Sequence, residues 1–347
     1  MITTASPISD RAFQVRVGPT IDKHVLAADV EAGLSSTPKR LPCAYFYDTR
    51  GTQLFQQITR RPEYYLPRAE MEILTEHADD IAAAVGRGTV VLELGCGAGP
   101  KSKLLLESLM RRQKTAVYCP IDVSESAIRQ NGAALMRELP GLSIEAELAE
   151  YDDGLDRFFS QEPAPTLVAF LGSSLGNMHR EEALGFLARL RRRARPFDMF
   201  LLGLDLEKEP EVINAAYNDA AGLTAQFNKN ILRRINKELG GEFDEDAFDH
   251  VARYNESKGR VEMHLKSRAA GFVRIEGLDR YVEFRAGETI WTESCYKYSR
   301  RKITEMCALT GWTPLHHWED GRGWFTALLL APAPDRGLFN RRAEPSI

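Results

Sequence analysis

The sequence predicts an α/β fold in which a mostly parallel sheet carries helices on both faces. Short apolar runs recur between residues 89 and 204, and each is followed by a turn and a stretch with helical spacing. This alternation is typical of βαβ units and of a doubly wound sheet. After residue 206 the pattern changes to a long helical stretch and then to runs of alternating polar and apolar residues. The change indicates a second part, of helices and a β-hairpin, inserted into the first.

The first predicted strand of the sheet runs into a glycine turn. Residues 89–94 are almost entirely apolar, as in a parallel strand that is covered on both faces. Gly95, Gly97 and Gly99 then let the backbone turn sharply and approach a ligand, because no Cβ is in the way. An ordinary tight turn can hold the same glycines. The G-x-G-x-G spacing, with the acid Glu93 just before it, resembles the first motif of class I S-adenosylmethionine-dependent methyltransferases, which have a Rossmann-like sheet.

The next two predicted strands also end near acids. The strand that ends at Asp122 places a carboxylate where it can accept both hydroxyls of an adenosine ribose. The strand 142–148 leads into Glu150 and Tyr151, which could hydrogen-bond the adenine amino group and stack on its ring. A solvated loop acid explains Glu150 alone equally well. The ordered set across three consecutive βα units predicts a site for a nucleoside-bearing cofactor.

The fourth predicted strand, 166–171, ends in a turn that runs from Gly172 to Asn177. Ligands of open α/β sheets lie outside the carboxyl ends of the strands, so this turn is expected to face the transferred group. A helix cap explains Asn177 alone equally well. A fifth strand, 199–204, and two closing strands near the end of the chain complete an expected sheet of seven.

The remaining segments are expected to build the second part and the ends of the chain. Residues 1–20 read as a loose arm, and the aromatics between Tyr45 and Tyr65 either fill a core or form a lid that offers hydroxyls. The other expected elements are helices at 22–34, 70–85, 101–112, 125–139, 181–193 and 301–310, an interrupted helical stretch at 209–239, and strands at 260–267, 270–275, 280–284, 313–318 and 324–330.

Composition restricts the class of protein further. The 347 residues are 44% hydrophobic and 27% charged, with a net charge of −4, which favours neither a nucleic-acid nor a membrane-surface partner. No apolar run approaches the roughly 20 residues that cross a bilayer. The five cysteines lack a C-x-x-C pair and the seven histidines lack metal spacing, so we expect no disulfide framework, no metal and a cytoplasmic location.

Several motifs together resemble the histidine Nα-methyltransferase family, whose members form hercynine on the ergothioneine route. The resemblance covers about residues 23–330. It is carried by residues 46–48, the segment around Phe55, and residues 61–65, 170–177, 216–224 and 292–294.

The family resemblance implies a domain organisation and a set of site residues. It implies an arm with part of the substrate-binding domain at 1–66, the methyltransferase core at 67–206 and 298–331, and an inserted substrate-binding part at 207–297. The tail at 332–347 is rich in proline and arginine and is expected to be disordered. S-adenosylmethionine is the implied methyl donor, held by Glu93, Gly95, Gly97, Lys101, Asp122, Glu150 and Tyr151. A free amino acid is the implied substrate, held by Tyr47, Phe55, Tyr64, Gly172, Asn177, Tyr217, Met263, Glu293, Ser294 and Cys295.

Within that set the resemblance implies distinct roles. Asn177 and Tyr217 orient the amine and carboxylate in catalysis, and Glu293 with Cys295 reads the imidazole. The chain is expected to act as a monomer.

Two departures from the family pattern bear on the substrate. Serine stands in the family at the place of Cys295, and Asp-Phe at Glu150-Tyr151. Cysteine is the poorer hydrogen-bond partner, although Ser294 next to it could compensate. Methylation of tryptophan or tyrosine is therefore an alternative to histidine, and a non-catalytic S-adenosylmethionine-binding protein is an alternative from another class.

Overall fold

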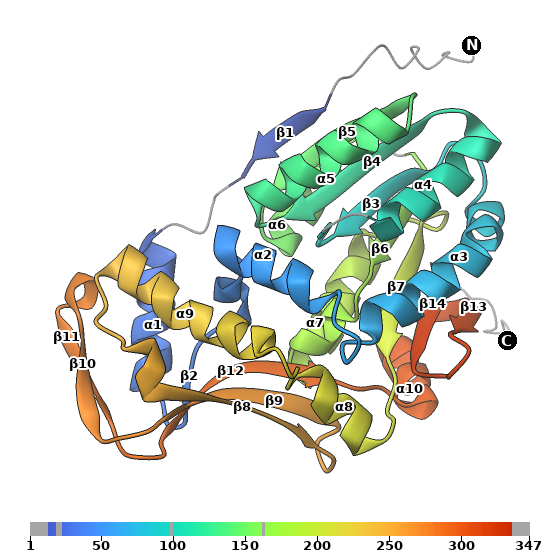
Figure 1. The fold of residues 1–347 in the computed structure, drawn as a ribbon. Coiled ribbons are helices and arrows are strands. Elements are labelled where there is room, and N and C mark those ends of the chain that lie inside the picture. Colours follow the sequence, from blue (N-terminus) through green and yellow to red (C-terminus); the bar gives the residue numbers. More distant parts are fainter. Residues whose placement is uncertain (1–12, 19–22, 98–99, 162–163, 335–347) are drawn as a thin grey trace, which may run out of the picture.

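The structure is a computed structural model that describes residues 13–18, 23–97, 100–161 and 164–334. Its main layer is a sheet in the strand order β1-β5-β4-β3-β6-β7-β14-β13 (Figure 1). All neighbours are parallel except β14, which runs antiparallel to both β7 and β13. The strands are β1 (Gln14–Val17), β3 (Val90–Leu94), β4 (Ala116–Asp122), β5 (Leu142–Leu148), β6 (Thr166–Phe170), β7 (Met199–Asp205), β13 (Trp312–Glu319) and β14 (Phe325–Pro332).

Helices cover both faces of this sheet, as the sequence predicts. Those on one face are α3 (Leu66–Val85), α4 (Pro100–Gln113) and α5 (Glu125–Glu138), and those on the other are α6 (Tyr151–Phe159), α7 (Arg180–Arg193) and α10 (Arg300–Thr310). Alternate residues of β3 separate the two cores: Val91 packs with the first set and Leu92 with the second. The fully covered central strands explain why their sequences are apolar runs and do not alternate.

The order of the strands defines the class of the fold. Beside β3 lie β4 on one side and β6 on the other, so the direction in which strands are added reverses there. That reversal is the topological switch point, where doubly wound sheets bind ligands at the carboxyl ends of their strands. The predicted α/β class and its seven strands are confirmed, with the antiparallel strand β14 placed between β7 and β13.

An eighth strand corrects the expected loose arm over residues 14–17. Residues 1–12 and 19–20 of that arm, and the expected tail from residue 335 on, lie outside the described residues. Residues 14–17 form β1, which pairs in parallel with β5 from Gln14 opposite Glu145 to Val17 opposite Leu148. The strand is short and largely exposed, and Arg16 holds it through ion pairs of 3.6 Å to Glu145 and 3.5 Å to Glu147. Partners 131 positions away in the chain leave no local pattern, which is why periodicity alone does not find this strand.

The second layer combines segments from both ends of the chain. A four-stranded sheet in the order β2-β12-β9-β8 lies beside the hairpin β10-β11 (Figure 1). The strands are β2 (Lys39–Arg40), β8 (Phe248–Asn255), β9 (Arg260–Ser267), β10 (Gly271–Ile275), β11 (Arg280–Phe284) and β12 (Thr289–Tyr296). The helices are α1 (Lys23–Ser35), α2 (Thr49–Ile58), α8 (Pro210–Ala216) and α9 (Leu223–Leu239), with 3-10 turns η1 (Cys43–Phe46), η3 (Glu245–Ala247) and η4 (Glu276–Leu278).

One hydrophobic core unites these segments. Phe46 from the N-terminal stretch, Phe227 on α9 and Leu265 on β9 are buried in the same cluster. Of the predicted β segments, 260–267 is β9, which β8 and β12 flank in the four-stranded sheet, whereas 270–275 and 280–284 form the separate hairpin β10-β11. The expected interrupted helix at 209–239 is α8 and α9, and the break between them contains Tyr217.

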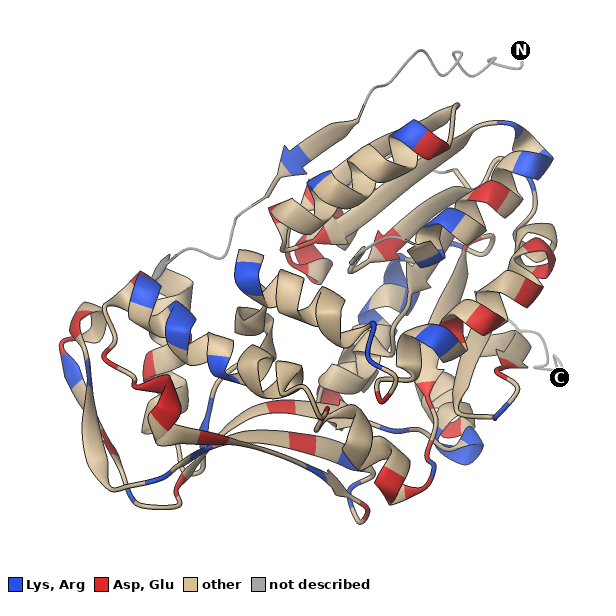
Figure 2. Ribbon diagram, in the orientation of Figure 1, with Lys and Arg blue, Asp and Glu red and all other residues tan. Residues whose placement is uncertain are grey.

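Charged residues of both signs are interspersed along these elements. Figure 2 shows lysines and arginines next to aspartates and glutamates on the helices around the large sheet. Many are paired at the surface, such as Lys103 with Glu138 at 2.6 Å and Arg111 with Asp79 at 2.5 Å. Among the described residues, no helix is both long and apolar enough to cross a membrane, and no three metal-ligating side chains form a group.

Candidate active site

The glycine turn lies at the switch point of the large sheet, directly after β3. Gly95 and Gly97 adopt φ angles of 76° and 48°, which side chains other than glycine rarely adopt. A Cβ on Gly95 would lie 2.9 Å from the Tyr151 hydroxyl, so the turn passes closely beneath the start of α6. Gly99 falls outside the described residues. This cradle, open to backbone approach, fits the ligand-binding role that the sequence predicts.

Glu93 lies beneath the turn with its carboxylate already bonded within the protein. Ser102 on α4 donates to it at 2.5 Å, and the Tyr118 hydroxyl on β4 donates to the same oxygen. Burial raises the pKa of Glu93 to about 7, although both hydrogen bonds favour the ionised form. The contacts suit an acid that ties β3 to β4 and α4 and so holds the turn in place.

The other predicted cofactor residues lie at the carboxyl ends of β4 and β5. Asp122 accepts the Ser124 N–H at 2.8 Å, and burial raises its pKa. Glu150 is exposed at the start of α6, and its side chain makes no hydrogen bond with the described residues. The ring of Tyr151 packs edge-on against Phe170, 5.4 Å between centroids. The structure thus brings Asp122, Glu150 and Tyr151 to the same edge of the sheet as the glycine turn.

Glu70 joins Lys101 to the turn that follows β6. Its carboxylate on α3 is fully buried, accepts the Lys101 ammonium at 2.6 Å, and accepts the Gly172 N–H at 2.9 Å with each oxygen. Gly203 on β7 leaves the space for it, because a Cβ there would lie 2.2 Å from the carboxylate. The sequence analysis missed Glu70. Its signal was an acid on the apolar face of α3, one helical turn before Ile73.

The turn after β6 continues into the 3-10 helix η2 (Ser174–Asn177). Gly172 and Ser173 both have positive φ, at 73° and 58°, which directs the chain sharply toward the second layer. Asn177 ends η2 half-buried, and its side chain makes no hydrogen bond with the described residues. An amide with free donor and acceptor positions at this place can bind both an amine and a carboxylate.

Five aromatic side chains form a continuous wall opposite this turn, in the second layer. The Phe55 ring meets Tyr47 at 5.7 Å and Tyr64 at 6.1 Å, and Tyr64 meets Tyr217 at 6.1 Å, all edge-on. Phe227 on α9 packs behind Tyr47 at 5.4 Å. The structure brings together the predicted residues Tyr47, Phe55, Tyr64 and Tyr217 and adds Phe227, which the sequence analysis did not select.

Strand β12 separates its predicted residues onto two faces. Glu293 pairs with Met263 and Cys295 with Val261, so both lie on the core face of the small sheet. Ser294 pairs with Glu262 on the opposite face, where its hydroxyl is buried without a partner among the described residues. Ser294 therefore does not join Glu293 and Cys295 and cannot compensate for the cysteine. Neighbouring residues on a strand point to opposite faces, and that rule already contained this result.

The Glu293 carboxylate has no hydrogen-bond partner among the described residues, although it is half-buried. Burial raises its pKa to about 7, against the opposing effect of Lys297. Burial first, and then the charge of Glu293, raise the pKa of the Tyr47 hydroxyl. This acid is surrounded by hydroxyls and aromatic rings and has no hydrogen-bond partner among the described residues. It is therefore available to a ligand that donates a hydrogen bond.

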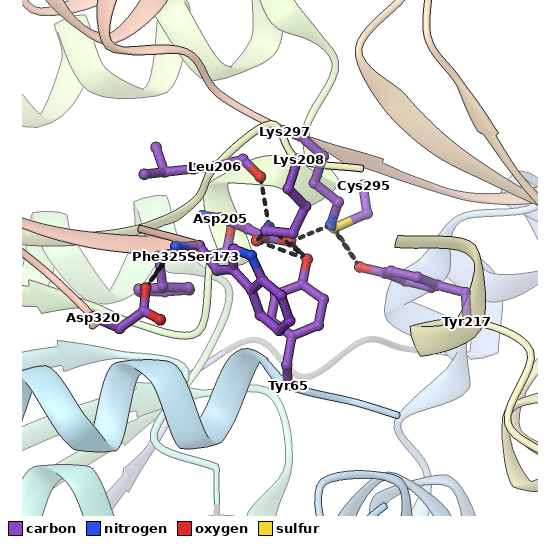
Figure 3. A network of polar contacts seen from close by, with 11 residues as sticks. Tyr65, Ser173, Asp205, Leu206, Lys208, Tyr217, Cys295, Lys297, Asp320 and Phe325 are labelled. Atoms are coloured by element: carbon purple, nitrogen blue, oxygen red, sulfur yellow. Dashed lines mark hydrogen bonds and ion pairs between the residues drawn. The ribbon is translucent and has the colours of Figure 1, made fainter. Parts of the chain in front are cut away.

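The Tyr217 hydroxyl belongs to a buried polar network that the sequence analysis did not predict (Figure 3). It donates to Cys295 Sγ at 2.8 Å and accepts from Lys297 Nζ at 3.0 Å. Lys297 is in turn paired with Asp205 at the carboxyl end of β7. No local motif marks the network as a whole, because its members come from β7, from the end of α8, from β12 and from the segment after it.

Comparison with known proteins agrees with the geometry. A family model described as histidine-specific, SAM-dependent methyltransferase matches residues 26–332. A histidine N-alpha-methyltransferase of Mycolicibacterium smegmatis is 41% identical over 302 residues, which are 87% of this chain and 93% of that protein.

Two fungal relatives are more distant. An ergothioneine biosynthesis protein 1 of Neurospora crassa is 31% identical over 84% of this chain and 33% of its own length. A 4-dimethylallyltryptophan N-methyltransferase of Arthroderma benhamiae is 29% identical over 83% of this chain and 88% of its own length.

The doubly wound sheet, its glycine cradle and the family match together define an S-adenosylmethionine-dependent methyltransferase. Within that class, the chain belongs to the histidine-specific methyltransferase family.

Proposed function

We propose that this enzyme transfers methyl groups from S-adenosylmethionine to the α-amine of free L-histidine and forms trimethylated histidine, hercynine. The observation that carries the proposal is the carboxylate of Glu293, which has no hydrogen-bond partner among the described residues. After burial, its charge helps to raise the pKa of the Tyr47 and Tyr64 hydroxyls, and Lys297 opposes the rise of its own pKa. An imidazole offers a ring N–H to such an acid and a flat surface to aromatic side chains. The family match and the bacterial relative support the same substrate.

The proposed methyl-donor site consists of the glycine turn and the acids that follow β4 and β5. Asp122 would bind the ribose hydroxyls, and Glu150 and Tyr151 the adenine. Gly95, Gly97 and Lys101 would surround the methionine end, with Glu93 supporting the turn from below. The donor supplies an activated sulfonium methyl group, so the chemical demand on the protein is modest.

The chain's own contribution is to hold the amine in line and to exclude water from it. Asn177 and Tyr217 are proposed to orient the amine and carboxylate, beside the turn at Gly172. Tyr47, Phe55, Tyr64 and Met263 would enclose the side chain that Glu293 and Cys295 contact. The amine must lose a proton before each transfer, and an amine in a partly desolvated site does so closer to neutral pH.

A second candidate is the same transfer to an aromatic amino acid such as tryptophan or tyrosine. Cys295 favours it, since its thiol is already engaged by Tyr217 and Lys297 and offers a ring N–H a weaker acceptor than serine would. One fungal relative is named for a different substrate, 4-dimethylallyltryptophan. In this reading the enzyme still acts on a small molecule; its oligomeric state is proposed to be monomeric.

Mass spectrometry tests the proposal most directly. The purified protein is incubated with S-adenosylmethionine and an equimolar mixture of the standard amino acids, and products are searched for one, two and three added methyl groups. Trimethylhistidine as the main product is the expected outcome. If the main product is another trimethylated amino acid, the second candidate function replaces the first. Binding of S-adenosylmethionine with no methylated product would favour a larger substrate or a binding role.

Glu293→Ala provides the site-specific prediction. Loss of a charge-assisted hydrogen bond to the ring N–H should raise the KM for histidine about tenfold or more, with a smaller effect on kcat. Initial rates at saturating S-adenosylmethionine measure both constants. Glu262→Ala is the matched control, because it removes a glutamate from the opposite face of the same small sheet. Unchanged histidine kinetics in Glu293→Ala would remove Glu293 from the proposed site.

A further inference from the structure

A buried ion pair joins the large sheet to the substrate side of the molecule. Lys297 Nζ lies 2.6 Å from Asp205, and the side chains of both residues are 0% exposed. Asp205 also accepts from the Tyr65 hydroxyl at 2.8 Å and from Lys208 Nζ at 2.5 Å (Figure 3). The carboxylate therefore has a second ammonium beside it that does not contact Tyr217.

Lys297 uses all three of its N–H donors. One goes to Asp205 at 2.6 Å, one to the Tyr217 oxygen at 3.0 Å and one to Cys295 Sγ at 3.2 Å. An ammonium can only donate, so the Tyr217 oxygen must act as the acceptor. The proton of Tyr217 is thereby directed away from Lys297, and in this structure it points at Cys295 Sγ, 2.8 Å away.

Backbone contacts from both sheets fix the ammonium in this place. The Tyr298 N–H donates to the Asp205 carbonyl at 2.9 Å, and the Lys297 N–H donates to the Gly259 carbonyl at 2.8 Å. A buried ion pair is a costly way to fill space, because desolvation offsets much of the attraction, and apolar side chains of similar size are often at least as stabilising. The cost is better explained by what the ammonium does to its third neighbour, Tyr217.

We propose that Lys297 is a positioning residue, which keeps the Tyr217 hydroxyl as a hydrogen-bond donor toward the α-carboxylate of the amino-acid substrate. The inference rests on the proposed function, because it assumes an amino-acid substrate beside Tyr217. It adds a selection rule: the enzyme discriminates against amines that have no carboxylate. Asp205 holds Lys297 in place, and Tyr65 helps to hold Asp205.

The test compares histidine with histidinamide, in which a neutral amide replaces the carboxylate. The wild-type enzyme should prefer histidine by kcat/KM. In Lys297→Met that preference should fall about tenfold or more, with the KM for histidine rising more than kcat falls, because a hydrogen bond to a charged group and its geometry are lost. If Lys297 had a purely structural role, the substitution would lower kcat/KM for histidine and for histidinamide alike and leave their ratio unchanged.

Lys208→Met is the matched control. It removes the other ammonium on Asp205, and in each variant the carboxylate keeps one lysine and the Tyr65 hydroxyl. The preference for histidine should stay at the wild-type value in Lys208→Met. An unchanged preference in Lys297→Met, or an equal fall in both variants, would overturn the proposal.

Tyr217→Phe completes the design and protects it against a variant that does not fold. It removes the hydroxyl but leaves the ion pair, so the preference for the carboxylate should fall as in Lys297→Met. The double variant should lose no more than either single one, because the lysine acts through the tyrosine. A wild-type preference retained in Tyr217→Phe would also overturn the proposal.

The proposed function and this inference fail in different ways. If wild-type protein methylates another amino acid, the proposed substrate is wrong. The same ratio is then measured with that amino acid and its amide. If wild-type protein binds S-adenosylmethionine but methylates neither histidine nor any other amino acid, the proposed function fails and the inference fails with it. If wild-type protein methylates histidine and ignores the carboxylate, only the inference fails.

Discussion

At the scale of single residues, Glu293 opposes stability at a place where we propose that it binds the substrate. Its carboxylate is half-buried and has no hydrogen-bond partner among the described residues, so burial raises its pKa to about 7. A group of this kind is a cost to the folded protein whenever it is ionised. We expect a ligand N–H to compensate that cost in the complex.

The raised pKa of Glu293 predicts how stability depends on pH. The pKa is about 4.5 in the unfolded chain and about 7 in the fold, so the folded state binds more protons between these values and loses stability as pH rises through them. Glu293→Gln removes this loss. The variant should match wild type near pH 4 and exceed it by about 1–3 kcal/mol at pH 8, as measured by urea unfolding at the two pH values.

The same variant provides an internal check. Glu293→Gln should be more stable than wild type at pH 8 and should also bind histidine more weakly. Glu181→Gln, an exposed acid on α7, should change neither quantity. Parallel pH curves for wild type and Glu293→Gln would contradict the assignment of the raised pKa to this residue.

At the scale of elements, η2 and β12 bring the two layers into close contact. A Cβ on Gly176 would lie 2.8 Å from the Tyr296 carbonyl, which is a backbone atom and cannot move independently of its strand. The turn that bears Asn177 is therefore seated directly on the strand that bears Glu293 and Cys295. A small shift between these elements would move the proposed amine-binding and ring-binding groups relative to one another.

Gly176→Ala should accordingly be destabilising. The added methyl forces η2 and β12 apart, at a cost of about 1–3 kcal/mol, and should also raise the KM for histidine. Gly185→Ala on α7 is the control, because its methyl meets only the flexible end of Arg189, and alanine favours the helix. Thermal unfolding and initial rates measure the two effects. Equal melting temperatures for the two variants would show that the contact tolerates a methyl group.

The elements also show where sequence reasoning succeeds and where it stops. Residues 90–94 and 199–205 could be predicted as strands, because burial on both faces leaves an apolar run in the sequence itself. The glycine turn and the acid at 122 follow from the same local logic. The ion pair of Asp205 with Lys297 joins positions 92 residues apart, so its existence depends on packing that no local pattern encodes. Strand β1 was missed for the same reason.

At the scale of the whole molecule, β1 forms the free edge of the large sheet. The Gly18 N–H donates to the Leu148 carbonyl at 2.9 Å, and the ring of Phe13 lies where a Cβ on Gly132 would meet it at 2.6 Å. The strand thus covers β5 and the adjacent surface of α5. Without it, the strand that leads to Glu150 and Tyr151 would become the edge of the sheet.

Deletion of residues 1–18 should therefore expose β5. We expect faster hydrogen exchange at the β5 amides that face β1 and weaker binding of S-adenosylhomocysteine, because local opening reaches the proposed adenine-binding residues. Deletion of residues 1–12, which keeps β1, is the control. Hydrogen exchange followed by mass spectrometry gives the readout. Unaltered exchange in the longer deletion would mean that β5 is protected without β1.

The second layer combines early and late segments of the chain, and this determines when it can fold during translation. Strand β2 pairs with β12, and Lys39 bonds to Glu288, 249 positions later in the chain. At roughly 5–20 residues per second, a ribosome needs about 12–50 s to produce the intervening stretch. Throughout that interval the apolar surfaces of α1, η1 and α2 lack the completed small sheet, while β1 and β3 to β7 of the large sheet are made and can pair with one another. A growing chain of this protein therefore exposes the apolar surfaces of α1, η1 and α2 until β12 has been made, and only then can the second layer close.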